Sequence, residues 1–383
     1  MDRRHFLQSA TAATAVAALP RAWAASPLKV AVMTTLSGPA GLFGPSSKAC
    51  AELAAETINA RGGILGRKLE LLFGDAGLAP AEASQAALKL WKGSGAGAVI
   101  GMHDSAVRGA LVGLFKGQVP YFYTPVYEGG ECARGTYMNG ETPQQQLQPV
   151  IPWIAAERKP SKWYLIGNDY IWGRNTNAAA KGYIAQTGAS VVGDEYLPFT
   201  VDNFDASLAR IRDSGADAVL VSLVGGASVG FNKAFASFGL ADKALRLGTL
   251  IEENTLAGIG LANAKNLYSS AGYFANIETP TARDFAQAYA RRFGPQAPAL
   301  NGLAESTYEG FLMLEAIAKK AGSLDVAKLE AASEGAGYDG PRGAVTMKSR
   351  HVEQDVYVAD VDAKGFRVVK TFPRVSSGQS CKV

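Results

Sequence analysis

The feature of this sequence that most constrains its fold is a regular alternation of short apolar runs with helical patterns, which occurs twice. Apolar runs of this length, bounded by turn residues, are typical of buried parallel strands. The alternation therefore predicts an α/β fold built from two doubly wound parallel-sheet lobes with right-handed crossovers. The strands are expected at residues 28–33, 69–73, 98–100 and 121–123, and then at 163–166, 190–196, 218–223 and 245–250. The helices are expected at residues 45–60, 79–91 and 105–115, and then at 174–187, 205–213 and 228–238.

The domain organisation follows from the length and from the joins between the two series. The chain has 383 residues, which is too long for one hydrophobic core. No long flexible linker separates the series, and short joins fall near residues 140–143, 272 and 350–354. Several joins between two lobes imply discontinuous domains with a hinge and an interlobe cleft. The predicted parts are an export signal at 1–24, a first lobe of 25–141 plus 273–352, and a second lobe of 142–272 plus 353–383.

The first 24 residues have the order of an export signal. An Arg-Arg pair at residues 3–4 precedes an apolar run at 9–19, and the sequence AWA at 22–24 supplies the small residues that a signal peptidase reads. The pair resembles a twin-arginine signal. The apolar run of about eleven residues is too short to span a bilayer. We expect a periplasmic mature protein beginning at Ala25 without direct membrane insertion, rather than a cytoplasmic helix that frays at its start.

Charge and residue counts exclude several classes of function. The net charge is +4, and no basic run with interleaved aromatic residues is present, so no nucleic-acid partner is expected. The cysteines are Cys50, Cys132 and Cys381, which allow one disulfide and leave one thiol, with the pairing open. Outside the signal the histidines are His103 and His351, so no metal site and no cofactor are expected.

Candidate ligand-binding residues follow from the topology. In an open parallel sheet, ligands bind outside the carboxyl ends of the strands, where free N–H groups of helix N-termini also point. The loops at these ends cover residues 36–43, 101–105, 124–128, 168–172, 224–228 and 251–254. Aromatic and polar residues gather there, as a small neutral or zwitterionic ligand requires. They include Ser105, Tyr123, Thr124, Tyr127, Tyr170, Trp172, Glu252 and Glu253.

One motif suggests an enzyme instead. Residues 226–230, with Ser228 at the centre, match the Gly-x-Ser-x-Gly nucleophile elbow and lie between an apolar strand and a helix. However, the sequence has no HGGG-type oxyanion segment, and His351 is the single histidine downstream. A secreted α/β-hydrolase or amidase using Ser228 is therefore an alternative hypothesis, and we predict no catalytic residues.

Several segments resemble a known class of receptors. The sequence NARGGILGRKLELLFGD at residues 59–75, with LSGP at 36–39, resembles the first lobe of the periplasmic Leu/Ile/Val-binding class with the type I fold. Residues 121–131, 163–177 and 273–290 are similar to its urea- and short-chain-amide-binding branch. The resemblance covers essentially all of the mature chain. It implies a non-enzymatic receptor whose lobes close over a small ligand and which delivers it to the membrane permease of an ABC transporter.

The resemblance also suggests roles for individual residues. Ser105, Tyr123 and Tyr170 match ligand-contacting positions of the branch, His103 falls where an aromatic residue commonly lines the pocket, and Val224 with Gly225 matches the second-lobe contact loop. The expected ligand is urea or a short-chain amide. The alternative within the class is a branched-chain or other amino acid, since Glu252-Glu253 stands where amino-acid receptors place an acid opposite the ammonium group. A ligand-binding sensor that contacts a regulator is a further alternative.

Overall fold

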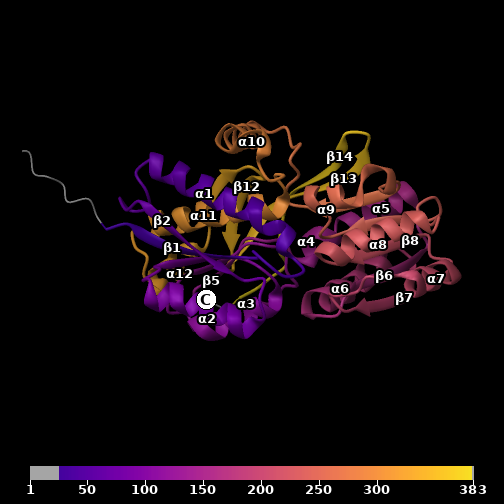
Figure 1. Cartoon of the computed structure of the whole chain (residues 1–383), viewed down its shortest axis with the longest axis horizontal. Coiled ribbons are helices and arrows are strands. Elements are labelled where there is room, and N and C mark those ends of the chain that lie inside the picture. Colours follow the sequence, from indigo (N-terminus) through magenta and orange to yellow (C-terminus); the bar gives the residue numbers. More distant parts are fainter. Residues whose placement is uncertain (1–25, 382–383) are drawn as a thin grey trace, which may run out of the picture.

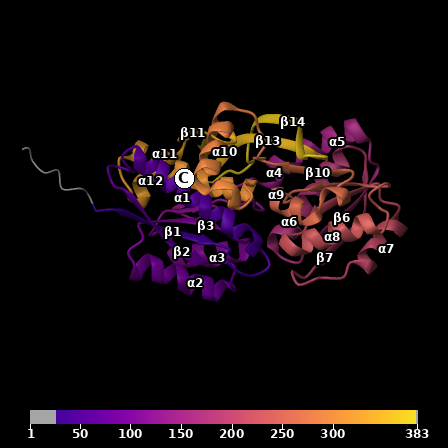
Figure 2. The same ribbon diagram turned by 45° about the horizontal axis from the view of Figure 1, so that its top comes forward.

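The computed structural model describes residues 26–381, so the predicted signal at 1–24 lies outside the described part. The first lobe contains a parallel sheet in the order β2-β1-β3-β4-β5, in which β1, β3, β4 and β5 are largely buried and the edge strand β2 is mostly half-buried. Helices cover both faces of this sheet, with α1 and α11 on one side and α2 and α3 on the other (Figures 1 and 2). Its strands are β1 (Leu28–Thr34), β2 (Leu69–Asp75), β3 (Ala98–Met102), β4 (Tyr121–Tyr123) and β5 (Thr136–Met138). Its helices in this part of the chain are α1 (Gly44–Ala60), α2 (Pro80–Leu88) and α3 (Ser105–Phe115).

The second lobe repeats the arrangement with a parallel sheet in the order β10-β9-β8-β6-β7. Its elements lie together at one end of the elongated molecule (Figure 1). The strands are β6 (Lys162–Asn168), β7 (Ser190–Leu197), β8 (Ala218–Ser222), β9 (Leu245–Gly248) and β10 (Leu267–Ala271). The helices are α4 (Pro143–Leu147), α5 (Val150–Arg158), α6 (Ile171–Gln186), α7 (Asp205–Ser214), α8 (Gly225–Ser237) and α9 (Glu253–Ile259).

One long strand, β13 (His351–Asp362), belongs to both sheets. At its start it pairs with β5 and with β12 (Gly343–Lys348), and further along it pairs antiparallel with β10 and with β14 (Gly365–Val375). The remaining chain between β10 and β13 returns to the first lobe. It forms α10 (Pro280–Phe293), α11 (Gly302–Ala321), α12 (Val326–Ser333) and β11 (Gly337–Gly340).

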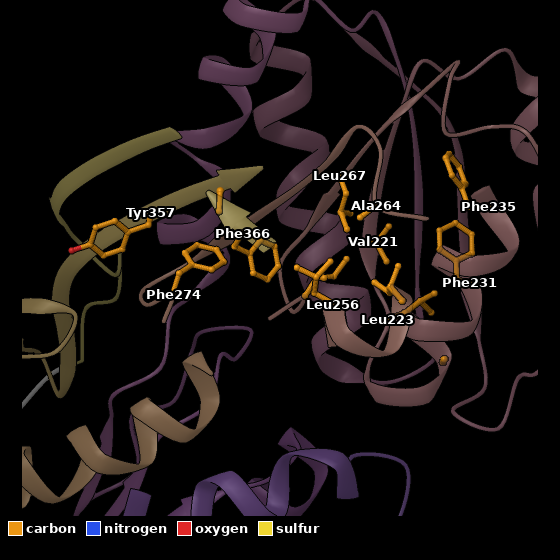
Figure 3. Close-up of a cluster of buried hydrophobic side chains, with 14 of the residues drawn as sticks. Val221, Leu223, Phe231, Phe235, Leu256, Ala264, Leu267, Phe274, Tyr357 and Phe366 are labelled. Atoms are coloured by element: carbon orange, nitrogen blue, oxygen red, sulfur yellow. The ribbon is translucent and has the colours of Figure 1, made fainter. Parts of the chain in front are cut away.

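A continuous apolar core holds the second lobe together and extends toward β13 and β14. Figure 3 shows side chains of β8 and α8, such as Val221 and Phe231, on one side, and Phe274 beside Phe366 on the other. The rings of Phe274 and Phe366 lie 4.9 Å apart. Burial of this apolar surface fixes the β13–β14 hairpin against the parallel sheet.

The predicted α/β fold with two parallel-sheet lobes is confirmed, while some element bounds differ. The predicted helices at 174–187 and 228–238 begin earlier, at Ile171 and Gly225, so residues expected in loops stand at helix N-termini. The disulfide joins Cys132 and Cys381, and Cys50 is a buried free thiol within α1.

Among residues 26–381, no helix combines the length and the apolar character needed to cross a membrane. In the same range no cluster of three His, Cys, Asp or Glu side chains is arranged to hold a metal ion.

Candidate ligand-binding cavity

A small cavity lies between the carboxyl ends of the strands of the two lobes. Its volume is about 40 Å³, and its walls come from both lobes. First-lobe strands and loops supply Thr35, Ala40, Phe43, Met102, His103, Asp104, Ser105, Tyr123, Pro125 and Val126; α11 supplies Leu303; and the second lobe supplies Tyr170, Val224 and Leu250. Five residues predicted from strand ends or from the resemblance therefore line one space: His103, Ser105, Tyr123, Tyr170 and Val224.

Ser105 is held at this cavity by a buried charge network behind it. Its hydroxyl donates to the Glu128 carboxylate over 2.6 Å and accepts from the Arg108 guanidinium over 3.1 Å. Arg108 also donates to Glu128 over 2.6 Å and lies 3.4 Å from a Glu131 oxygen. The side chains of Arg108 and Glu128 are almost fully buried, so their bonds are little screened by solvent. The network fixes the Ser105 rotamer and neutralises the arginine.

His103 contributes a neutral imidazole. Burial lowers the pKa of His103 to about 4, so the ring is uncharged at neutral pH. Its Nδ1 lies 3.1 Å from the Asp104 carbonyl oxygen and its Nε2 lies 3.0 Å from the Tyr121 hydroxyl. Nδ1 therefore carries the hydrogen and Nε2 accepts, an assignment made from the partners. The Tyr123 hydroxyl donates to the His103 carbonyl oxygen over 2.6 Å.

Tyr170 lines the same cavity from the second lobe. It stands at the N-cap position of α6, and its ring contacts Phe199, with centroids 4.8 Å apart, and Trp172, with centroids 6.0 Å apart. Burial raises the pKa of the Tyr170 phenol well above its usual value, so the hydroxyl keeps its proton and can donate.

Asp104 supplies a carboxyl group that the sequence prediction did not include among the ligand-binding residues. It caps α3, accepting from the Val107 N–H over 2.9 Å, and it lines the cavity. Burial raises the pKa of this carboxyl. Its position between His103 and Ser105, directly before a predicted helix, could have identified it in the sequence as a ligand-binding candidate.

A second cavity of about 20 Å³ shares the walls Val126, Leu250 and Leu303 with the first. It is lined by Glu252 and by Glu141. The Glu252 carboxylate caps α9, accepting from the N–H groups of residues 254 and 255 over 3.0 Å each. Burial raises its pKa. Glu252 therefore borders an adjoining space rather than the main cavity, and its carboxylate already has partners.

The other predicted residues lie elsewhere. Glu253 lines a separate groove of about 480 Å³ with Leu256 and Phe366. Thr124 donates to the Gly101 carbonyl over 3.2 Å, and the Tyr127 hydroxyl bonds the His351 ring, so both are buried outside the cavity lining. Glu253, Thr124 and Tyr127 therefore do not line the candidate ligand cavity.

Gly225 makes a close approach between the lobes. Its φ of +56° is in the left-handed region, and a Cβ atom there would lie 2.3 Å from the Pro39 carbonyl oxygen of the first lobe. Asn254 in α9 likewise donates to the Leu42 carbonyl over 3.2 Å. These contacts bring the second lobe directly against the loop that carries Phe43.

The nucleophile-elbow motif lacks the surroundings that hydrolysis needs. Ser228 is fully buried in α8, and its hydroxyl has no hydrogen-bond partner among residues 26–381. His351 bonds Tyr127 and the Ser349 carbonyl instead. The described chain therefore offers Ser228 no base.

Two α/β lobes that enclose a small, partly apolar cavity at their strand ends define a two-lobed small-molecule-binding protein. The model of the family described as "Periplasmic binding protein" matches residues 27–366, and the chain belongs to that family. It is 27% identical over 346 residues to Leu/Ile/Val-binding protein homolog 6 of Brucella melitensis biotype 1, covering 87% of each chain. It is 25% identical over 312 residues to homolog 3 of the same organism, covering 78% of this chain and 80% of that protein.

Solved structures share the fold at low sequence identity. A solute binding protein of an ABC transporter from R. palustris, in complex with 4-hydroxybenzoate, matches with a TM-score of 0.83 at 23% identity and covers 92% of this chain and 98% of its own. A branched-chain amino acid transporter substrate binding protein from Streptococcus pneumoniae, in complex with isoleucine, matches with a TM-score of 0.79 at 18% identity, covering 91% and 99%.

Proposed function

We propose that this chain is the periplasmic substrate-binding component of an ABC importer, without catalytic activity. The family membership and the two-lobed fold support this function. The proposed lobes are those of the sequence analysis, with crossings after residues 141, 272 and 352. In the proposed cycle the lobes close over the ligand and present it to the membrane permease subunits of the transporter.

We propose urea or a short-chain amide as the ligand class, and the lining of the cavity is the observation that carries this proposal. None of the described residues that line it is Lys or Arg, and burial keeps His103 neutral. A ligand carboxylate would therefore find no cation to pair with, whereas a neutral amide requires none. A water molecule needs about 10–15 Å³ of cavity, so about 40 Å³ suits a ligand of few non-hydrogen atoms.

The polar lining matches the groups of an amide. From the first lobe, the Asp104 carboxyl group and the side chains of His103 and Tyr123 line the cavity. From the second lobe, Tyr170 lines it with its phenol. An amide nitrogen donates two hydrogen bonds and its carbonyl accepts two. We expect the N–H groups to face Asp104 and the carbonyl to accept from a hydroxyl such as that of Tyr170. Tyr170→Phe should then weaken binding by about 0.5–1.5 kcal/mol, the cost of one neutral hydrogen bond.

The test is a ligand panel measured by thermal shift and then by calorimetry. Acetamide, propionamide, urea, isoleucine, leucine and 4-hydroxybenzoate are added to the mature protein in turn. A true ligand at a hundred times its dissociation constant should stabilise the protein by about 2.7 kcal/mol. We expect stabilisation by an amide or urea. Stabilisation by the acids or amino acids, with none by the neutral compounds, would contradict the proposed ligand class.

A branched-chain amino-acid receptor is the second candidate, favoured by the names of the Brucella relatives and by apolar walls such as Leu250 and Leu303. Glu252→Gln separates the two if the amino acid extends its ammonium group into the adjoining cavity that Glu252 lines. A buried ammonium that loses its carboxylate partner costs about 2–5 kcal/mol. An amide should lose less than about tenfold in affinity, or about 1.4 kcal/mol. A loss of several hundredfold would favour the amino acid. Glu253→Gln, in the separate groove, is the matched control.

Export by the twin-arginine route is also proposed, with cleavage after Ala24. Replacing the arginines at 3 and 4 with lysine should leave precursor in the cytoplasm. Continued appearance of a protein starting at Ala25 in the periplasm would indicate the general secretory route instead.

A further inference from the structure

The chain makes an additional, covalent connection between its lobes after β14. Residues 376–381, which we call the return segment, leave the end of β14 and reach Cys132 in the first lobe, where Cys381 forms the disulfide. The two cysteines are 249 residues apart in the sequence. On the way, the Ser377 carbonyl accepts from the Thr142 hydroxyl over 2.9 Å.

The disulfide is attached to the loop that supports the ligand cavity. This support loop, residues 127–132, carries the Glu128 carboxylate that holds both Ser105 and Arg108. It also carries Glu131, whose carboxylate lies 3.4 Å from Arg108 and whose carbonyl oxygen lies 3.3 Å from the disulfide sulfur of Cys381. The chain of contacts therefore runs from the disulfide through the support loop to Ser105 at the cavity wall.

The support loop has little regular structure of its own to fix it. It contains no helix or strand, and Gly129 and Gly130 stand next to each other with φ of +91° and +86°. Two adjacent glycines have more conformational freedom than other residues, so this loop gains much backbone entropy if it is no longer held in place. The return segment supplies the constraint, since the Gln379 amide oxygen accepts from the Gly130 N–H over 2.7 Å beside the disulfide.

We propose that Cys132 and Cys381 are positioning residues for the ligand cavity: their disulfide holds the support loop so that Glu128 fixes Ser105, and reduction of the disulfide loosens the cavity. Cys132 is solvent-exposed, so a thiol reagent can reach the bond. With a dithiol reductant, the S–S bond breaks and both cysteines gain a hydrogen. The two electrons and two protons come from the dithiol, which closes to a cyclic disulfide.

The first test measures positioning without any ligand. Amide hydrogen exchange is followed by mass spectrometry in the parent, in the double variant Cys132→Ser/Cys381→Ser, and in the parent reduced with dithiothreitol. We expect exchange at short times to become at least severalfold faster at residues 104–108 and 127–132 and in the released return segment. Helix α8 in the second lobe should be unchanged. Gln379→Ala, which keeps the disulfide, is the matched control and should show a smaller change.

Reversal separates a positioning role from a structural one. Reoxidation of the reduced parent with glutathione disulfide should restore the slow exchange at both segments, whereas the double variant cannot respond. Faster exchange spread evenly over both lobes would show that the disulfide affects only global stability and would overturn the proposal. Unchanged exchange at residues 104–108 would overturn it as well.

The second test rests on the proposed function and uses acetamide as the probe in calorimetry. We expect the double variant to bind acetamide about threefold to thirtyfold more weakly than the parent, since Ser105 loses its fixed rotamer. Equal affinity would argue against positioning of the cavity. If the parent itself does not bind acetamide, the amide assignment fails, and the exchange experiment still decides the role of the disulfide.

Discussion

Arg342 is the cation of a buried cluster at the junction of the lobes. Its guanidinium lies 2.5 Å from Glu305, 3.0 Å from Glu309 and 3.6 Å from Glu141, all with nearly fully buried side chains. It also donates to the Gln354 side chain of β13 over 2.5 Å. Three acids thus share one arginine where the chain crosses between the sheets.

We predict that Arg342→Met destabilises the protein by about 3–5 kcal/mol, the usual cost of removing one partner from a buried ion pair. The methionine fills the space but leaves the acids without a cation. The measurement is urea unfolding of the ligand-free protein followed by circular dichroism. Arg212→Met is the control, because Arg212 pairs with Asp213 on the surface with both side chains more than half exposed. Its unfolding midpoint should not change measurably.

The pH dependence of the Arg342→Met effect checks the mechanism. Burial raises the pKa of Glu305 well above its usual value even beside the arginine. A carboxyl whose folded pKa is above its unfolded pKa contributes stability below the unfolded value and loses it as the pH rises through the folded value. Without Arg342 this effect grows, so the destabilisation should be smaller near pH 5 than near pH 8. A loss under about 1 kcal/mol, or one equal at both pH values, would refute the reasoning.

Three further predictions concern single residues. Ser228→Ala should leave ester and amide hydrolysis at the background of the parent, because Ser228 has no base in the described chain; turnover in the parent that the variant lacks would favour a hydrolase. Ligand affinity by calorimetry should stay within about twofold from about pH 6 to pH 8, because the pKa of His103 is lowered to about 4; a steep change would mean that the imidazole or the buried Asp104 carboxyl titrates there. Burial raises the pKa of Glu253 to about 8, so this carboxyl lowers stability increasingly as the pH rises from its unfolded value of about 4.5 toward 8. The urea midpoint of Glu253→Gln should therefore rise relative to that of the parent as the pH increases from about 4.5 to about 8. A difference between the two midpoints that does not depend on pH would contradict this.

The sequence predicts the parts of the fold that depend on local pattern. The helix at 105–115 and the strand at 121–123 have the predicted bounds, because a capping acid at Asp104 and a short buried run of aromatic residues mark them clearly. The strand β5 was missed, since its three residues carry no periodic signal. The early starts of α6 and α8 were missed because glycines at 173 and 225 look like loop residues in the sequence.

The candidate site was predictable where strand ends alone define it. The cavity residues His103, Ser105 and Tyr123 follow β3 or end β4, as the topology rule requires. Leu303 was not predictable, because it reaches the cavity from a helix about two hundred residues away in the sequence. The pairing of Cys132 with Cys381 was equally inaccessible, since three cysteines allow three pairings and only the tertiary fold selects one.

Glu141 links the Arg342 cluster to the small cavity that adjoins the candidate ligand cavity. Its carboxylate accepts from the Gly272 N–H at one crossing and lies near Arg342, while its side chain lines the small cavity beside the main one. A ligand shifts an equilibrium between open and closed lobes only by its differential affinity for the two states. Contacts from the first lobe alone would leave that equilibrium unchanged. In the proposed cycle, closure therefore depends on the second-lobe walls Tyr170, Val224 and Leu250, which contact the ligand in the closed state.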